Sequence, residues 1–139
     1  MRQRIPEYRR TVEHWRLVMG LTTRIRTLAS SGSLQERFQR WRNAKQQTYQ
    51  RYSRPPLLSD WLCIHSHEGS WSDSGSPYWG GLQMDLTFQQ SYGGWLLRHK
   101  GTADHWTALE QIWTALKAYH SRGFEPWKGT AALCGLYTG

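Results

Sequence analysis

The clearest pattern of apolar and polar positions lies between residues 107 and 123. Apolar side chains recur there at the three- and four-residue spacing of one helix face, at Leu109, Ile112, Trp113, Leu116 and Tyr119. Thr107 and Glu110 form a capping box before them, and Gly123 follows as a typical helix end. The pattern therefore predicts a helix with one buried face.

A second capping box, Ser33 with Glu36, predicts a helix that begins near Ser33. The residues at helical spacing after it are Leu34, Phe38, Trp41, Thr48, Tyr49 and Tyr52, and the basic residues between them are Arg37, Arg40, Arg42 and Lys45. We expect an amphipathic helix whose apolar stripe packs on the rest of the domain. Residues 7–29 mix basic and apolar side chains and predict another helix.

Shorter elements are predicted after the proline pair at positions 55 and 56. Ser59 or Asp60 can cap a short helix that runs to about Glu68. Residues 72–77, with the sequence SDSGSP, form a turn between two aromatic segments. We therefore expect a small β-hairpin within residues 71–83.

The remaining elements complete the predicted fold class. Asp85 can cap a helix to Tyr92, which the glycines at 93 and 94 would end, and residues 124–139 are expected to be irregular. The order of elements predicts an α+β domain, mainly helical with one small β-hairpin, preceded by a helical basic extension.

Charge divides the chain into two parts. Residues 1–54 hold 13 Lys and Arg against 3 Asp and Glu, a net charge of +10, whereas residues 55–139 hold 5 against 7. The change falls at Arg54-Pro55-Pro56, a natural linker. We predict a basic extension over 1–54 and a separate domain over 55–139. A basic arm favours anionic partners, and a solvated basic helix is the alternative interpretation.

Composition excludes some classes of protein and favours others. Hydrophobic residues are 38% and charged residues 20% of the chain, as in soluble globular domains. No run of about 18 apolar residues predicts a transmembrane helix, and no clear signal peptide precedes the domain. The nine tryptophans suit both a small core and a carbohydrate site, where flat indoles pack on sugar rings.

Two cysteines, Cys63 and Cys134, lie near the ends of the second part. A disulfide between them is expected if the protein is extracytoplasmic, and two buried thiols are expected if it is cytosolic.

Glu68 is the candidate acid. It lies at the C-terminal end of a predicted helix, where the helix dipole disfavours a carboxylate, and nearby aromatic residues such as Trp71 would desolvate it. Both effects raise the pKa of a carboxyl group, as a glycosidase needs for protonating a leaving oxygen. A surface glutamate at a helix end is the alternative.

Other residues could support that chemistry. Asp85 is a candidate second carboxylate or simply a helix N-cap. The glycines at 80 and 81 would let the backbone approach a ligand, and Gln83 could bind an N-acetyl group or a hydroxyl. His65 and His67 face different sides of a helix, so we expect no metal site and no cofactor.

The ordered motifs in this region resemble a known family. The segments 61–71 (WLCIHSHEGSW) and 78–84 (YWGGLQM), followed by Gly123-Phe124, Pro126-Trp127 and Cys134, resemble the transglycosylase-like domain of actinobacterial resuscitation-promoting factors. The likeness covers about residues 61–136 and implies a small fold of the c-type lysozyme kind. It also implies an extracellular or cell-wall protein that cleaves peptidoglycan.

The resemblance implies roles for individual residues. Glu68 aligns with the catalytic glutamate, Gln83 with a residue of the substrate cleft, and Thr87 falls near a threonine of that cleft. The family often has a cysteine directly before the glutamate, bridged to a C-terminal cysteine. Here that position is His67, and Cys63 lies one helical turn earlier, so the bridge would have a shifted anchor.

The predicted function is therefore a lytic transglycosylase or a lysozyme-type hydrolase. Glu68 would protonate the oxygen between N-acetylmuramic acid and N-acetylglucosamine, and Trp71, Tyr78 and Trp79 would line the subsites. Two alternatives are a non-catalytic glycan-binding module of the same fold, and polyanion binding through the basic arm. That arm could hold an anionic cell-wall polymer, whereas nucleic acid is disfavoured because no reader motif is present.

Overall fold

The computed structural model describes residues 4–23 and 32–137. The chain divides into two compact units, Met1–Arg54 and Pro55–Gly139. The boundary coincides with the proline pair and with the change in charge. Among the described helices, none is long and apolar enough to cross a membrane.

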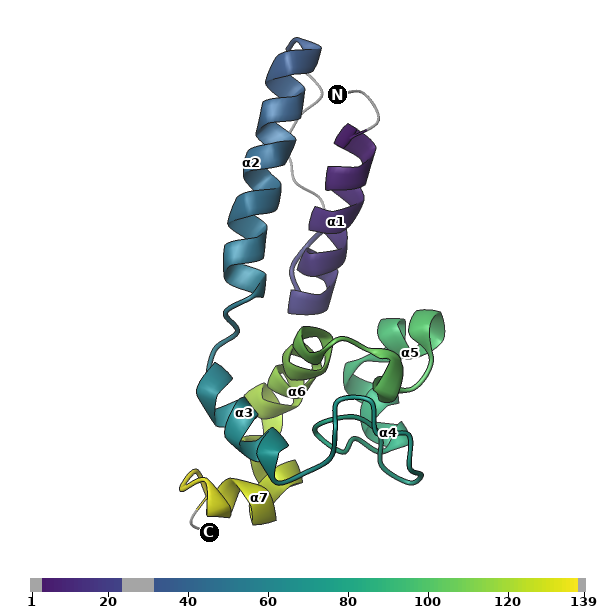
Figure 1. Ribbon diagram of the computed structural model, residues 1–139, viewed down its shortest axis with the longest axis vertical. Helices are drawn as coiled ribbons and strands as arrows, with labels where there is room; N and C mark the ends of the chain where they lie inside the picture. The colour runs from purple at the N-terminus through teal and green to yellow at the C-terminus, as the bar shows by residue number, and fades with distance from the viewer. Residues whose placement is uncertain (1–3, 24–31, 138–139) are drawn as a thin grey trace. The chain divides into compact units, whose positions relative to one another are not determined.

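The first unit contains two helices, α1 (Arg4–Met19) and α2 (Leu34–Tyr52). They lie side by side and run in the same direction (Figure 1). Their ring contacts show the parallel register, because Tyr8 packs on Phe38 at 5.7 Å and Trp15 packs on Tyr49 at 5.4 Å.

The helix ends of the first unit agree in part with those predicted from the sequence. Ser33 and Glu36 form the capping box that begins α2. The helix expected over 7–29 begins earlier and ends at Met19. Gly20 follows with a φ of +80°, a backbone conformation that ends a helix readily. Residues 24–29 of that expectation lie outside the described residues.

The second unit is built from short helices around one core (Figure 1). In chain order these are α3 (Leu58–Ser66), α4 (Leu86–Tyr92), α5 (Gly94–Lys100), η2 (Ala103–His105), α6 (Ala108–Arg122), η3 (Glu125–Trp127) and α7 (Lys128–Leu133). Trp61 of α3 lies at the centre, fully buried. Its ring packs on Phe124 at 5.3 Å and on Trp127 at 5.0 Å.

The α+β prediction with a β-hairpin over 71–83 is wrong. In the described residues there is no strand, and one isolated bridge joins Trp79 to Met84. The neighbouring backbone groups bond elsewhere: Gly80 donates to the carbonyl of Asp73, and Gly81 donates to the side chain of Gln111. With its amides engaged in this way, the segment forms a folded loop, and the described part of the unit is helical.

The sequence patterns missed the short helical segments α5, η2, η3 and α7. Gly93 ends α4 and is the N-cap of α5, which begins at Gly94. Position 93 has no room for a side chain, because a Cβ atom there would lie 2.6 Å from the Trp106 ring. The tail expected to be irregular contains η3 and α7. The buried indole of Trp127 anchors these two short helices by donating to the carbonyl of Leu82 at 2.8 Å.

Candidate active site

Glu68 follows directly after the end of α3, where His67 is the C-cap. Its side chain is half-buried. The hydroxyl of Thr130, in α7, donates a hydrogen bond to Glu68 Oε1 at 3.0 Å. The same hydroxyl lies 3.1 Å from the carbonyl oxygen of Trp127, which it can also reach as a donor. Glu68 is thus oriented by a residue 62 positions further along the chain.

The surroundings of Glu68 favour the protonated acid. Burial raises the pKa of the Glu68 carboxyl above its usual range. The hydrogen bond from Thr130 and the electrostatic effect of His67 act in the opposite direction and offset part of that rise. A carboxyl group with a raised pKa can keep its proton closer to neutral pH, as a general acid requires.

Gln111 holds the loop that follows Glu68. This side chain is fully buried in α6. Its Oε1 accepts from the amide of Gly81 at 2.8 Å, and its Nε2 donates to the carbonyls of Trp71 at 2.9 Å and Trp106 at 3.0 Å. Three separate stretches of backbone are joined by one amide, which replaces the strand pairing that the sequence predicted.

The glycine pair is required by close packing in this loop. A Cβ atom on Gly80 would lie 2.4 Å from Gln111 Oε1, and Gly80 also has a φ of +82°. A Cβ atom on Gly81 would lie 2.4 Å from the Trp71 ring and 2.6 Å from His65. The pair therefore serves the packing of the loop, rather than the approach of backbone to a ligand.

Gln83 lies next to the catalytic candidate. Its Nε2 donates to Asp73 at 2.9 Å and to the carbonyl of Gly80 at 2.9 Å. A Cβ atom on Gly69 would lie only 2.7 Å from that same nitrogen, so Gln83 packs against the residue after Glu68. Because both hydrogen bonds use the nitrogen, the amide oxygen can accept from a ligand.

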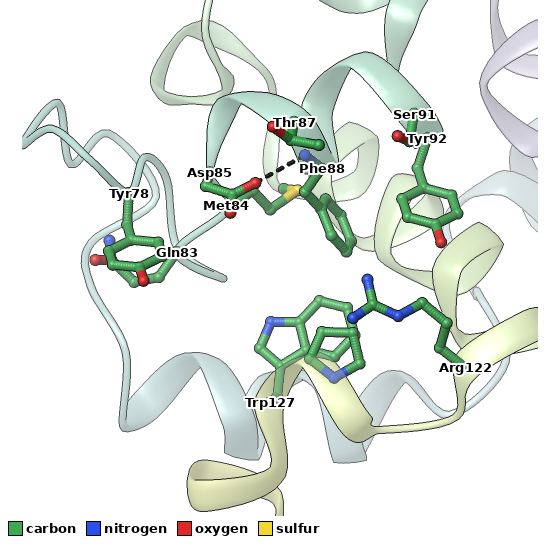
Figure 2. A pocket seen from close by; sticks show the side chains of 11 residues that line it. Tyr78, Gln83, Met84, Asp85, Thr87, Phe88, Ser91, Tyr92, Arg122 and Trp127 are labelled. Atoms are coloured by element: carbon green, nitrogen blue, oxygen red, sulfur yellow. Dashed lines mark hydrogen bonds between the residues drawn. The ribbon is translucent and has the colours of Figure 1, made fainter.

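A cavity of about 310 Å³ lies beside this loop, within the range of small-molecule sites, about 300–1,000 Å³. Thr87 and Phe88 of α4 face Trp127 and Arg122 across it (Figure 2). The full set of lining residues is Tyr78, Gln83, Met84, Asp85, Thr87, Phe88, Ser91, Tyr92, Arg122, Pro126 and Trp127.

Four of the predicted site residues meet at this cavity, namely Tyr78, Gln83, Asp85 and Thr87. Tyr78 is half exposed and lies at the same end as Gln83 (Figure 2). Glu68 does not line the cavity and is linked to its lining only through intermediate residues. Thr130 connects it to Trp127, and Gly69 packs against Gln83.

Trp71 and Trp79 are not among the cavity residues. The Trp71 ring stacks on His65, with ring centroids 3.8 Å apart. Trp79 exchanges both backbone hydrogen bonds with Met84. Trp71 thus has a packing role, and Trp79 contributes backbone hydrogen bonds to the loop.

Asp85 is the N-cap of α4. Its Oδ1 accepts from the amide of Phe88 at 2.8 Å, the bond drawn as a dashed line in Figure 2. A carboxylate whose oxygen caps a helix is engaged in that cap, so Asp85 is a poor candidate for attack on a sugar carbon.

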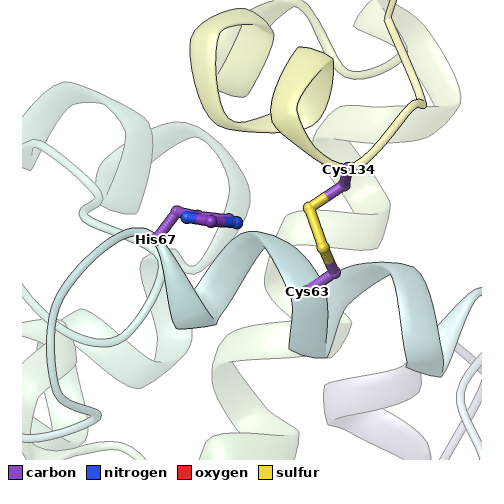
Figure 3. Close-up of side chains that lie close together, drawn as sticks. All are labelled: Cys63, His67 and Cys134. Atoms are coloured by element: carbon purple, nitrogen blue, oxygen red, sulfur yellow. A yellow bond between two sulfur atoms is a disulfide. The ribbon is translucent and has the colours of Figure 1, made fainter.

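Cys63 and Cys134 form a disulfide that joins α3 to the end of α7. His67 lies beside the sulfur atoms, and all three ligand-type atoms are within 4.8 Å of one another (Figure 3). Sulfurs bonded to each other are not the thiolates that a metal ion requires. The bridge instead fixes α7, and with it Thr130, against the helix that leads to Glu68.

Two residues at the site were missed by sequence reasoning. Thr130 contacts Glu68, and Arg122 is the sole cation among the described residues that line the cavity. Both lie in segments far along the chain from Glu68, and neither belongs to a motif. No periodicity or spacing could have indicated them.

The comparisons with known proteins add no relative: no protein-family model matches the chain, and no curated protein is significantly similar to it.

Proposed function

We propose that residues 55–139 form a peptidoglycan-cleaving glycosidase in which Glu68 is the general acid. The observation that carries the proposal is the carboxyl of Glu68, which is half-buried, has a raised pKa and is oriented by Thr130. Its chain neighbour Gly69 packs against Gln83, which lines the cavity. The resemblance of the motifs around Glu68 to the resuscitation-promoting factor family supports the same assignment.

The composition of the cavity supports peptidoglycan over a neutral glycan. Tyr78, which is 49% exposed, offers apolar ring surface to the face of a sugar, and Thr87 offers a hydroxyl. Arg122 contributes a positive charge, which suits the carboxylate of the lactyl group on N-acetylmuramic acid. A chitin strand carries no such group.

The reaction begins with proton transfer from Glu68 to the oxygen of the bond between N-acetylmuramic acid and N-acetylglucosamine. The bond from the muramic C1 to that oxygen breaks, and the oxygen leaves as a hydroxyl on N-acetylglucosamine. The nucleophile then forms a bond from its oxygen to the muramic C1, and the Glu68 carboxylate accepts the proton that this oxygen loses. In a lytic transglycosylase that nucleophile is the 6-hydroxyl of the muramic residue, and in a muramidase it is water.

The hydrogen bonds of the nearby carboxylates favour the transglycosylase route, which forms a 1,6-anhydro product. Asp85 caps α4, and Asp73 accepts from Gln83 and from the amide of Gly75. Both are engaged in hydrogen bonds that hold the loop and helix. Transglycosylation requires only one carboxyl group, because the sugar supplies its own nucleophile.

The disulfide supports a location at the cell wall or outside the cell. Disulfides persist in oxidising compartments and are rare in the cytosol, and the bridge between Cys63 and Cys134 closes most of the second unit. This is also where the proposed substrate lies.

The test is digestion of purified sacculi, followed by mass spectrometry of the soluble fragments. We expect 1,6-anhydro products from the parent chain, and a loss of activity of roughly 100- to 10,000-fold in Glu68→Gln. Glu36→Gln is a matched control, because glutamine also completes a capping box and this residue lies in α2. Equal digestion by the two variants would overturn the role of Glu68. Binding to sacculi without released fragments would favour the non-catalytic module.

A further inference from the structure

The first unit contains a groove that the proposed cleavage reaction does not use. It lies between α1 and α2 and has a volume of about 470 Å³. Its lining residues are Tyr8, Trp15, Arg42, Lys45, Gln46 and Tyr49. All six belong to the same compact unit, so the site is complete within residues 4–52.

Aromatic rings form the walls of this groove. Trp15 packs on Tyr49 with ring centroids 5.4 Å apart and planes inclined at 49°. Tyr49 is 52% exposed, which leaves much of its ring facing solvent. Trp15 also stacks on Tyr52 at 5.5 Å, and this contact fixes the orientation of the indole. The groove therefore presents rigid apolar faces to a ligand.

Positive charge lies along the same groove. Lys45 Nζ is 4.8 Å from the centre of the Tyr8 ring, and Arg42 is exposed one turn earlier on α2. None of the described lining residues is acidic, so no carboxylate in the groove neutralises these charges. The unit as a whole has a net charge of +10.

We propose that the groove between α1 and α2 binds an anionic glycan, a polymer of sugar rings that carry carboxylates or phosphates. Ring faces of tyrosine and tryptophan pack on the CH faces of sugars, and Arg42 and Lys45 pair with the acidic groups. Gln46 can donate to or accept from a hydroxyl. The volume is adequate for a short stretch of such a polymer.

Aromatic and basic side chains together could also bind single-stranded nucleic acid. The glycan is favoured because the disulfide of the second unit indicates an oxidising compartment. This choice between the two polymers also rests on the proposed function, which places the enzyme at a cell wall. The groove would then hold the enzyme on anionic wall polymers while the second unit cleaves.

The test is isothermal titration calorimetry on the full-length Glu68→Gln chain at an ionic strength of about 0.15 M. The probes are an oligogalacturonate, a sugar-phosphate polymer of the teichoic type, a chitooligosaccharide of the same length, and an oligothymidylate. Because the Glu68→Gln chain is expected not to cleave, calorimetry measures glycan binding alone. A failure of the groove proposal is therefore distinguishable from a failure of the proposed cleavage reaction.

The groove variant carries Arg42→Gln and Lys45→Gln. The matched control carries Arg10→Gln and Arg51→Gln, two exposed residues of the same helices that do not line the groove. We expect the groove variant to weaken binding of the acidic glycan about tenfold or more. The control, which changes net charge equally, should weaken it less than about threefold.

A third variant, Tyr49→Ala, removes an exposed ring of the groove and should also weaken binding, with unchanged helix content by circular dichroism. Equal losses in the groove variant and its charge-matched control would overturn the site, because charge alone would then explain binding. Equal affinity for the neutral chitooligosaccharide would overturn the requirement for an anion. Tighter, groove-dependent binding of the oligothymidylate would overturn the glycan in favour of nucleic acid.

Discussion

Two features of the surroundings of Glu68 shift the pKa of its carboxyl in opposite directions. Burial raises the pKa of its carboxyl, and the hydroxyl of Thr130 offsets part of that effect. A group whose pKa is higher in the folded chain than in the unfolded chain binds its proton more tightly when folded. Its contribution to stability is therefore lost as pH rises from the unfolded pKa, about 4.3 for glutamate, through the folded pKa.

Glu68→Gln should consequently stabilise the protein at neutral pH. Glutamine cannot ionise, and its amide oxygen can still accept from Thr130. We expect the melting temperature of the variant to exceed that of the parent at pH 7, and the difference to shrink towards zero below about pH 4, where the parent carboxyl is also protonated. Differential scanning calorimetry across this pH range measures the effect. Parallel curves for the two proteins would show that folding does not raise the pKa of Glu68.

Arg122 is predicted to select the substrate. It lines the cavity at the end of α6, opposite Thr87. If its guanidinium pairs with the muramic carboxylate, Arg122→Gln should raise KM for a peptidoglycan fragment about tenfold or more with a smaller change in kcat. Arg98→Gln, an exposed arginine of α5 outside the cavity, is the control. An unchanged KM would show that Arg122 does not contribute to substrate binding.

At the scale of elements, the loop between α3 and α4 owes its shape to side chains of other helices. Gln111 of α6 binds backbone at Trp71, Gly81 and Trp106, and Trp127 of η3 binds the carbonyl of Leu82. This loop carries both Glu68 and Gln83, so its order matters for the candidate site.

Gln111→Met should therefore destabilise the second unit. The thioether has a similar length but cannot replace the three hydrogen bonds, and each buried polar group left unpaired costs about 1–3 kcal/mol. We expect a fall in the free energy of unfolding of roughly 2–4 kcal/mol, because the backbone relaxes in part. Urea denaturation of this variant beside Gln90→Met, an exposed position of α4, measures it. Equal stability of the two variants would contradict the structural role of Gln111.

The sequence patterns predicted the helix ends correctly where the interacting residues lie close together in the chain. The capping boxes at Ser33 and Thr107 formed because the residues that make them are three positions apart in the chain. The pattern over 71–83 failed because the aromatic and turn residues there also suit a loop. Whether such a segment pairs with itself depends on partners such as Gln111, which lie outside it.

On the scale of the whole molecule, the disulfide stabilises the second unit. It joins residues 71 positions apart. The chain-entropy model assigns about 4 kcal/mol to a loop of this length. The bridge also ties α7, which carries Thr130, to α3, which leads to Glu68.

The double variant Cys63→Ser, Cys134→Ser should lose about that much unfolding free energy, and wall cleavage should fall with it because Thr130 is no longer anchored. Chemical denaturation of the parent with and without a reducing agent, beside the variant, measures the first effect. The free energy of unfolding of the reduced parent should equal that of the variant. The reducing agent should not change the free energy of unfolding of the variant. A parent whose stability is unchanged on reduction would contradict the prediction.

The sequence by itself determined the helices with strong caps, the change in charge at the proline pair, and a short list of candidate side chains that includes Glu68. These features depend on residues close together in the chain, where spacing and backbone preference act directly. Only the tertiary structure decided that residues 71–83 form a loop without strands, that Asp85 caps a helix, and that Trp71 packs on His65. It alone brought Thr130 to Glu68 and Arg122 to the cavity. Those contacts depend on how separate helices pack together, and packing is a property of the whole chain that no local pattern contains.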